Sequence, residues 1–303
     1  MHLSAILLVL ASGFLHAGWN YLAKSSRDKI SFLWLAKLAA LLVLSPLLLY
    51  YLFYHGGLEV LITNYRTLLY LGVGSGFVHF FYNYFLSMAY RFGDISFTYP
   101  IARGLAPFLV ALFSFFFLSE VPSSLGILGM ALVASGMFLM VASKSAGEEN
   151  EDDGPDKDKG SSLLSGKAPL IFAVLTSVTI ASYIFLDGKG SREFTPFLFM
   201  YAYSLTSTIL LAVPVMKRKE ELVLEFETNL KNVLFTGVMM PSSYFLALSA
   251  MQLAQLGYVA SFRNISVVFA TLLGVVKLKE EFTFYRLIGS LVIFLGAVLL
   301  SIG

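Results

Sequence analysis

Ten apolar stretches, each 20 to 25 residues long, alternate with short polar segments along the chain. An α-helix of roughly 20 apolar residues, rising ~1.5 Å per residue, crosses the ~30 Å hydrocarbon core of a bilayer. The pattern therefore predicts an all-α integral membrane protein with ten transmembrane helices. The predicted helices cover residues 3–23, 31–54, 67–89, 94–118, 123–143, 168–187, 194–216, 231–250, 255–277 and 283–302.

The composition strengthens this prediction and limits the partners. Of 303 residues, 57% are hydrophobic and only 13% are charged, whereas a soluble domain carries about a quarter charged residues. The expected partners are the lipid bilayer and a small-molecule substrate. Nucleic acid is not expected, and a homodimer is left open. Because the chain has no cysteine, disulfides, thiolate catalysis and cysteine-bound metal are excluded, and no cofactor is expected.

Residues 144–167 form the only long polar stretch, and they include the acidic run 148–153. This stretch is too charged to bury an apolar surface, so we predict a disordered linker. An acidic interaction tail is the alternative interpretation. The linker divides the chain into two predicted five-helix units, residues 1–143 and 168–303.

The two units are related by an internal repeat. Residues 84–140 reappear without gaps 160 positions later, so that Arg103 corresponds to Arg263 and Glu120 to Glu280. The segment 24–28 is echoed 165 positions later by 189–193. Because each unit has an odd number of predicted helices, the second begins on the opposite side of the membrane. This predicts inverted repeats around a shared central site, as in many secondary transporters.

The basic residues that flank the predicted helices indicate an orientation. Fourteen lie on one face and three on the other, and Lys and Arg are enriched in cytoplasmic loops. The count predicts that the 14-charge face is cytoplasmic and that both termini lie outside. The three residues of the minor face are Arg66, Lys189 and Arg192.

Two arginines stand out because they lie nine to ten residues inside predicted helices. A charged group at that depth costs roughly 2.5–3.5 kcal/mol by insertion scales. Arg103 and Arg263 either hold neighbouring carbonyls and tyrosines as structural contacts or present two guanidinium groups to an anionic substrate. Tyr99, one turn before Arg103, and Asn264, next to Arg263, are candidate partners in that substrate site. Pro100 and Pro107 can kink the helix that carries Arg103.

Two further clusters share the spacing i, i+3, i+4, which places each on one helical face. Histidines in such positions either satisfy interhelical hydrogen bonds or line a substrate cavity. Lys37 is shallow enough to extend to the membrane surface, and we interpret it as structural. The two clusters are His16, Trp19 and Asn20, and His79, Tyr82 and Asn83.

Carboxylates are expected only at helix ends, where Asp94, Glu120, Asp187 and Glu280 fall. An exporter of cationic drugs driven by protons generally needs a buried carboxylate. The predicted absence of one inside a helix favours anionic or zwitterionic substrates. If protons are coupled to transport, His16 or His79 is the expected carrier.

These motifs resemble those of the EamA-type members of the drug/metabolite transporter superfamily. The resemblance covers nearly everything except 144–167 and implies ten helices in two inverted repeats, with helices four and nine lining the cavity. Related sugar-phosphate translocators hold phosphate with basic residues on those helices, which favours Arg103 and Arg263. The resemblance also implies cytoplasmic termini, but we prefer the charge count for this chain. It is carried by residues 15–20, Lys24, 99–104, 118–120, 262–267 and 278–280.

The sequence therefore predicts a secondary carrier in the inner membrane of a bacterium. Its expected substrate is an amino acid, an organic acid or an organophosphorus compound, moved by alternating access around a central cavity. A membrane enzyme or a non-transporting assembly protein that binds lipid head groups is the alternative. No metal-ligand spacing, phosphate-binding glycine loop or Ser/His/Asp arrangement supports an enzyme.

Overall fold

The computed structural model describes residues 1–24, 26–92, 101–145, 167–278 and 284–303, and their regular structure is helical throughout. Residue Tyr99 and the carboxylates Asp94 and Glu280 lie outside this described part. The helices are α1 (Leu3–Lys24), α2 (Lys29–Tyr54), α3 (Gly57–Phe92), α5 (Ala106–Leu118), α6 (Ser124–Ser145), α7 (Ala168–Glu193), α8 (Pro196–Val215), α9 (Lys219–Leu253), α10 (Leu256–Phe262), α11 (Ile265–Leu278) and α12 (Phe284–Ile302).

Each predicted range has a helical counterpart, because apolar length is what a bilayer-spanning helix requires. Seven described helical segments are long and apolar enough to cross a membrane, and two more apolar helices are shorter. Some helices extend past their predicted ranges: α3 begins at Gly57 and α9 begins at Lys219. The ranges 94–118 and 255–277 are not single helices, and both are interrupted beside an arginine.

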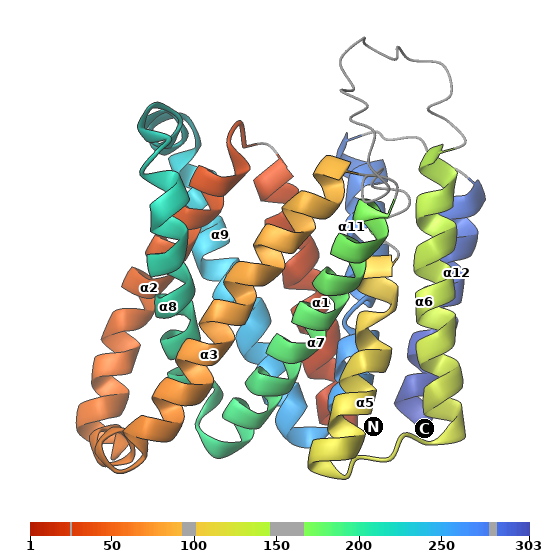
Figure 1. The fold of residues 1–303 in the computed structure, drawn as a ribbon, viewed down its shortest axis with the longest axis horizontal. Coiled ribbons are helices and arrows are strands. Elements are labelled where there is room, and N and C mark those ends of the chain that lie inside the picture. The colour runs from red at the N-terminus through yellow and green to blue at the C-terminus, as the bar shows by residue number, and fades with distance from the viewer. Residues whose placement is uncertain (25, 93–100, 146–166, 279–283) are drawn as a thin grey trace.

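The helices stand side by side as an upright bundle (Figure 1), and the closest pairs join the two halves of the sequence. Helix α6 packs on α12, α3 on α7, and α1 on α9. The α6–α12 contact depends on glycine: a Cβ added at Gly129 would lie 2.9 Å from the Gly296 carbonyl, and one at Gly136 would lie 2.7 Å from the Gly289 carbonyl. These four glycines, seven residues apart on each helix, therefore allow α6 and α12 to pack closely.

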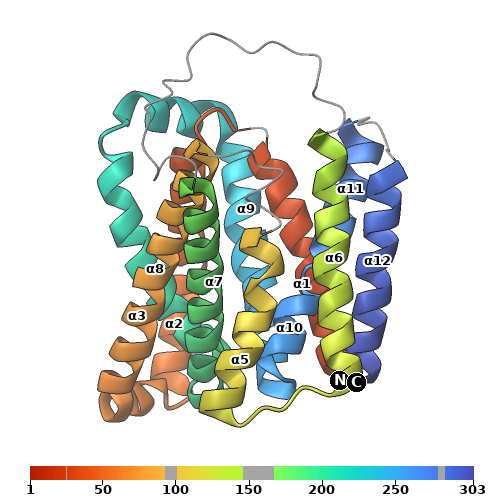
Figure 2. The ribbon, with the colours of Figure 1, turned by 45° about the vertical axis from the view of Figure 1, so that its right-hand side comes forward.

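The bundle has two distinct ends (Figures 1 and 2). Both chain termini lie at one end, which we call the termini end; the connections α1–α2 and α8–α9 lie at the other, which we call the basic end. Helix α1 begins at the termini end and α7 begins at the basic end. The two matching segments therefore enter the bundle in opposite directions, the relation that inverted repeats require.

Hydrogen bonds at the basic end fix the α1–α2 connection. The carboxylate of Glu225, fully buried on α9, accepts from the amides of Arg27 and Asp28 and from the Asn229 side chain, the last at 2.8 Å. Asp28 caps α2 by accepting from the Ser31 amide at 3.0 Å. These contacts tie the first half of the chain to the beginning of α9 in the second half.

Candidate functional site

Arg103 lies where the helix that was predicted over 94–118 is interrupted. Residues 101–104 are helical, Leu105 forms a bend that keeps right-handed helical dihedral angles (φ −75°, ψ −31°), and α5 begins at Ala106. The interruption is therefore a local loss of helical hydrogen bonding. Pro107 has no N–H, so it cannot donate to the carbonyl of Arg103 four residues earlier. The Ser177 hydroxyl of α7 donates instead to the nearby carbonyls of Ile101, at 2.8 Å, and Ala102, at 2.9 Å.

Arg263 lies at the corresponding interruption in the second half. Helix α10 ends at Phe262, and Arg263 and Asn264 form a turn before α11 begins. Asn264 is buried, and its backbone N–H donates to the Ser261 carbonyl at 3.0 Å. Helices α5 and α11 thus both begin within the depth of the bundle, directly after an arginine (Figure 1). The positive end of each helix dipole lies there.

Tyrosines hold both guanidinium groups. Arg103 donates from Nη2 to the Tyr82 hydroxyl at 3.2 Å, and the Tyr82 ring lies 5.7 Å from the Tyr183 ring. The Arg263 Cζ lies 4.8 Å from the centroid of the Tyr244 ring. Among the described residues, the buried Arg263 Nε has no hydrogen-bond partner. Arg263 therefore retains a donor for a ligand.

His79 connects the aromatic groups. Its ring centroid lies 4.1 Å from that of Tyr183 and 4.9 Å from that of Tyr203. Its Nδ1 lies 3.1 Å from the Ser75 carbonyl, which can only accept, so Nδ1 carries the proton when the ring is neutral. The unprotonated Nε2 then faces Asp187 Oδ2 at 3.9 Å.

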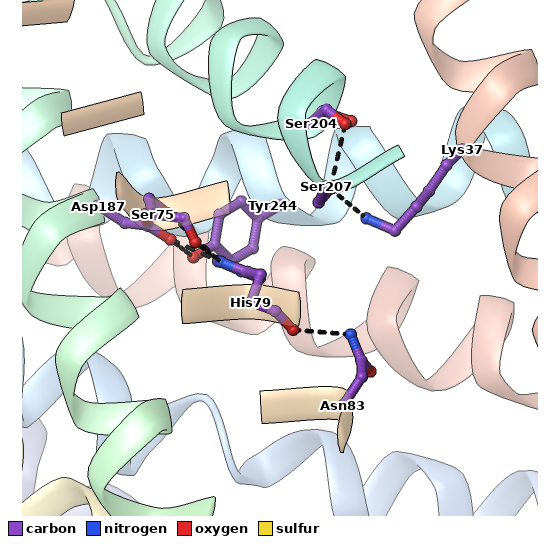
Figure 3. A network of polar contacts seen from close by, with 8 residues as sticks. All are labelled: Lys37, Ser75, His79, Asn83, Asp187, Ser204, Ser207 and Tyr244. Carbon is purple, nitrogen blue, oxygen red and sulfur yellow. Dashed lines mark hydrogen bonds and ion pairs between the residues drawn. The ribbon is translucent and has the colours of Figure 1, made fainter. Parts of the chain in front are cut away.

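Asp187 corrects the prediction that carboxylates lie only at helix ends. It is fully buried within α7 and accepts hydrogen bonds from the hydroxyls of Ser75 and Tyr244 (Figure 3). The predicted helix ended at 187, whereas α7 continues past two glycines to Glu193. Those glycines instead permit close packing: an added Cβ would lie 2.4 Å from Leu256 at Gly188 and 2.1 Å from Phe199 at Gly190.

The cluster on α1 approaches the same region from the opposite side. The rings of His16 and Trp19 meet edge-on at 5.0 Å, and the charges of Arg263 and Arg103 both act on His16. The buried His16 Nδ1 has no hydrogen-bond partner among the described residues. Helix α1 packs against α11, where Gly13 lies against Ile265.

Each asparagine of the two clusters donates a hydrogen bond within its own helix. Asn20 donates to the His16 carbonyl at 2.7 Å, and Asn83 donates to the His79 carbonyl at 2.8 Å. Both bonds join residues four positions apart, so each asparagine supports its own helix one turn after the histidine. The matching spacing of the two clusters is therefore accompanied by a matching hydrogen bond.

Lys37 differs from its prediction. It was expected to extend to the membrane surface, but its ammonium points towards α8 and donates to the Ser207 hydroxyl at 3.1 Å (Figure 3). Its charge, like that of Arg263, acts on His79. Three cationic side chains thus act on one region of the described bundle, together with a single carboxylate, Asp187. The excess of positive charge suits an anion.

Tyr183 and Tyr203 were not predicted as site residues, and Asp187 was predicted at a helix end. Within an apolar helix, a tyrosine carries no pattern that separates a site residue from a packing residue. Tyr244 had a weak signal, because it belongs to the repeated segment that begins at Tyr84.

Comparisons with known proteins agree with this architecture. Residues 3–142 and 167–302 each match the description of the EamA-like transporter family. A solved structure titled "Crystal structure of protein" has a TM-score of 0.73 and 15% sequence identity, and the match covers 100% of this chain and 98% of that one. At this identity the likeness shows the fold alone. A search of curated proteins finds no match.

Proposed function

The chain belongs to the EamA-like transporter family, and from this premise we propose that it is a secondary carrier of a small anionic or zwitterionic metabolite. Amino acids, organic acids and organophosphorus compounds are the candidate substrates. The observation that carries the proposal is the pair of repeat-related arginines, each at a helix interruption. Interrupted helices near the middle of a bundle are where secondary transporters bind their substrates.

The charges of the site favour an anion. Arg103 and Arg263 supply two guanidinium groups, and α5 and α11 begin within three residues after them. Guanidinium groups bind carboxylates and phosphates through paired hydrogen bonds, and helix N-termini favour the same groups. Asp187 balances only part of this positive charge, and the tyrosine rings of the site offer aromatic faces to the amine of a zwitterion.

Alternating access requires each end of the bundle to open in turn. A polar cluster, which we call the termini-end cluster, ties α5, α7 and the α9–α10 connection together. Arg192 pairs with Glu120 at 2.6 Å and donates to the Met251 and Ala254 carbonyls at 2.9 and 3.0 Å. Glu120 also accepts from the Leu256 amide at 2.9 Å. In our proposal this cluster closes the termini end and separates when the basic end closes.

The inverted repeat supports this role for the cluster. At the spacing of 165 residues, Arg192 corresponds to Arg27 at the basic end. We place the basic end in the cytoplasm on the charge count, in the inner membrane of a bacterium, with the five-helix units 1–143 and 168–303 on either side of the acidic linker.

Counterflow in proteoliposomes tests the proposal. Vesicles containing the purified protein are loaded with one unlabelled metabolite at a time, and uptake of the labelled compound is followed. We expect acceleration by at least one anionic or zwitterionic metabolite and none by cations. Acceleration by cations alone would contradict the proposal.

A further inference from the structure

The two carboxylates that are fully buried in the described structure, Asp187 and Glu225, differ in the groups that surround them. Glu225 accepts from two backbone N–H groups, which can only donate, and from the side-chain NH2 of Asn229. Asp187 accepts from two hydroxyls, those of Ser75 and Tyr244. A hydroxyl can donate or accept. Asp187 can therefore take up a proton and keep its hydrogen bonds, whereas Glu225 Oε1 faces two backbone N–H groups and would lose a hydrogen bond on protonation.

The groups facing Asp187 also provide a place for that proton. When Nδ1 of a neutral His79 donates to the Ser75 carbonyl, the lone pair of its Nε2 faces the Asp187 carboxylate at 3.9 Å. Two acceptors that face each other at this distance repel, and one proton between them removes the repulsion. The other titratable or charged groups around this pair are Tyr183 on α7, Tyr203 on α8, Tyr244 on α9, Arg263 after α10 and Lys37 on α2.

Tyr244 links this carboxylate to the anion site. Its hydroxyl donates to Asp187, and the face of its ring carries the Arg263 guanidinium at 4.8 Å. The charge of Arg263 acts on Asp187. An anion bound to Arg263 neutralises the charge that stabilises the Asp187 carboxylate, so anion binding and proton binding favour each other. By linkage, the effect is equal in both directions.

We propose that Asp187, with His79 and Tyr244, is a proton-binding site coupled to the arginine pair, so that the carrier moves its anion together with a proton. The proton is taken from water by the Asp187 carboxylate on the side where the anion enters. It returns to water on the other side, after the anion leaves. No bond other than the O–H bond forms or breaks. The proposal rests on the proposed function, because it assigns the arginines to the anion.

The repeat supports a dedicated role for Asp187. The arginines occur in both halves, but the position 165 residues before Asp187 is Leu22. The carboxylate therefore occurs in only one of the two repeats. A symmetric anion site needs the arginine pair but has no need of this carboxylate. One proton site beside one pair of arginines gives a defined ratio of proton to anion.

Infrared spectroscopy of the purified protein tests the proton site without any substrate. The carbonyl stretch of a protonated carboxylic acid is followed as the pH is lowered. We expect a band that appears reversibly in the wild type and is missing in Asp187→Asn, which keeps the size and the hydrogen-bonding capacity of the side chain. Glu225→Gln is the matched control at a second buried carboxylate and should retain the band.

The variant Arg263→Gln tests the coupling, because losing that charge imitates its neutralisation by a bound anion. At the pH where half of Asp187 is protonated in the wild type, we expect the ratio of protonated to ionised Asp187 to rise about tenfold, or ~1.36 kcal/mol. Exposed Lys189→Gln should leave the ratio unchanged.

An Asp187 band that is absent or independent of pH would overturn the proton site, and an unchanged ratio in Arg263→Gln would overturn the coupling. Neither readout involves transport. A protein that fails to exchange anions but shows both effects would contradict the proposed function and leave the proton site standing.

Discussion

The guanidinium carbon of Arg263 lies 4.8 Å from the centroid of the Tyr244 ring. The ring covers one face of the cation, and the buried Arg263 Nε has no hydrogen-bond partner among the described residues. The same tyrosine donates its hydroxyl to Asp187. Tyr244 therefore makes two separate contacts: its ring packs on Arg263 of the proposed anion site, and its hydroxyl donates to the Asp187 carboxylate.

Substitutions at Tyr244 should distinguish the effect of the ring from the effect of the hydroxyl. Tyr244→Phe keeps the ring, so the affinity for the transported anion should change less than about threefold, while Asp187 loses one hydrogen bond. Tyr244→Leu also removes the cation–π contact, which is worth roughly 0.5–2 kcal/mol, so affinity should fall about two- to thirtyfold. Isothermal titration with the transported anion measures both. Equal losses in the two variants would show that the ring has no part in holding Arg263.

The termini-end cluster should control the rate of conformational exchange. Arg192→Gln removes the ion pair with Glu120 and weakens the contacts that join α7 to the α9–α10 connection. We expect the termini end to be open in a larger share of the molecules, measured as a larger distance between spin labels at exposed Val121 and Leu253. The anion affinity of the arginine site should be retained. The nearby variant Lys189→Gln alters only an exposed pair and should keep the wild-type distance. Identical distances in Arg192→Gln would contradict the closing role.

Stability at acid pH should depend on Asp28 at the basic end. Partial burial alone would raise the pKa of Asp28, but hydrogen bonds from Ser31 and the charge of Arg218, 2.8 Å away, lower the pKa below its usual value. A lowered folded-state pKa stabilises the fold above the unfolded-state pKa of about 3.9, and this contribution is lost as the pH falls through the folded-state value.

Replacement of Asp28 tests this contribution. Asp28→Ala removes the cap of α2 and should cost ~0.5–2 kcal/mol at neutral pH. Asp28→Asn keeps a capping oxygen and should cost less. Melting curves between neutral and acid pH should show the difference between wild type and Asp28→Ala shrinking as the pH approaches 3. A difference that stays constant would mean that Asp28 acts without its charge.

The charge count predicts the orientation in the membrane. A periplasm-active reporter fused after Gly303 should be active, and a cytoplasm-active reporter inserted within 144–167 should be active as well. The physical reason is the retention of Lys and Arg on the cytoplasmic side. The reverse pattern would place the termini in the cytoplasm, as the family resemblance implied.

Much of the helical architecture could be predicted, because the bilayer fixes how long an apolar helix must be. The pair Arg103 and Arg263 was accessible for a different reason: the repeat identifies two equivalent positions without any knowledge of contacts. Pro107 gave a sign of the first interruption, because it removes a helix donor. No proline follows Arg263 at the corresponding position, which is Val267, so the second interruption required the structure.

Asp187 shows why the rest could not be predicted. Two glycines follow it, and glycine is common at helix ends. Helix α7 nevertheless continues to Glu193, and Gly188 and Gly190 pack directly against Leu256 and Phe199. Whether a glycine ends a helix or admits a neighbouring side chain is decided by tertiary packing. The position of Lys37 depends likewise on α8, which supplies Ser207.

The arginine pair is the central claim, and anion affinity in purified Arg103 and Arg263 variants tests it most directly. A charge-assisted hydrogen bond contributes roughly 1.5–3 kcal/mol, so Arg103→Gln and Arg263→Gln should each weaken binding about ten- to hundredfold. Lysine keeps the charge without the planar fork, so Arg263→Lys should recover part of the loss. The double variant should be non-additive if one anion contacts both groups. Melting temperatures near that of the wild type, combined with unchanged affinity in both glutamine variants, would contradict the account.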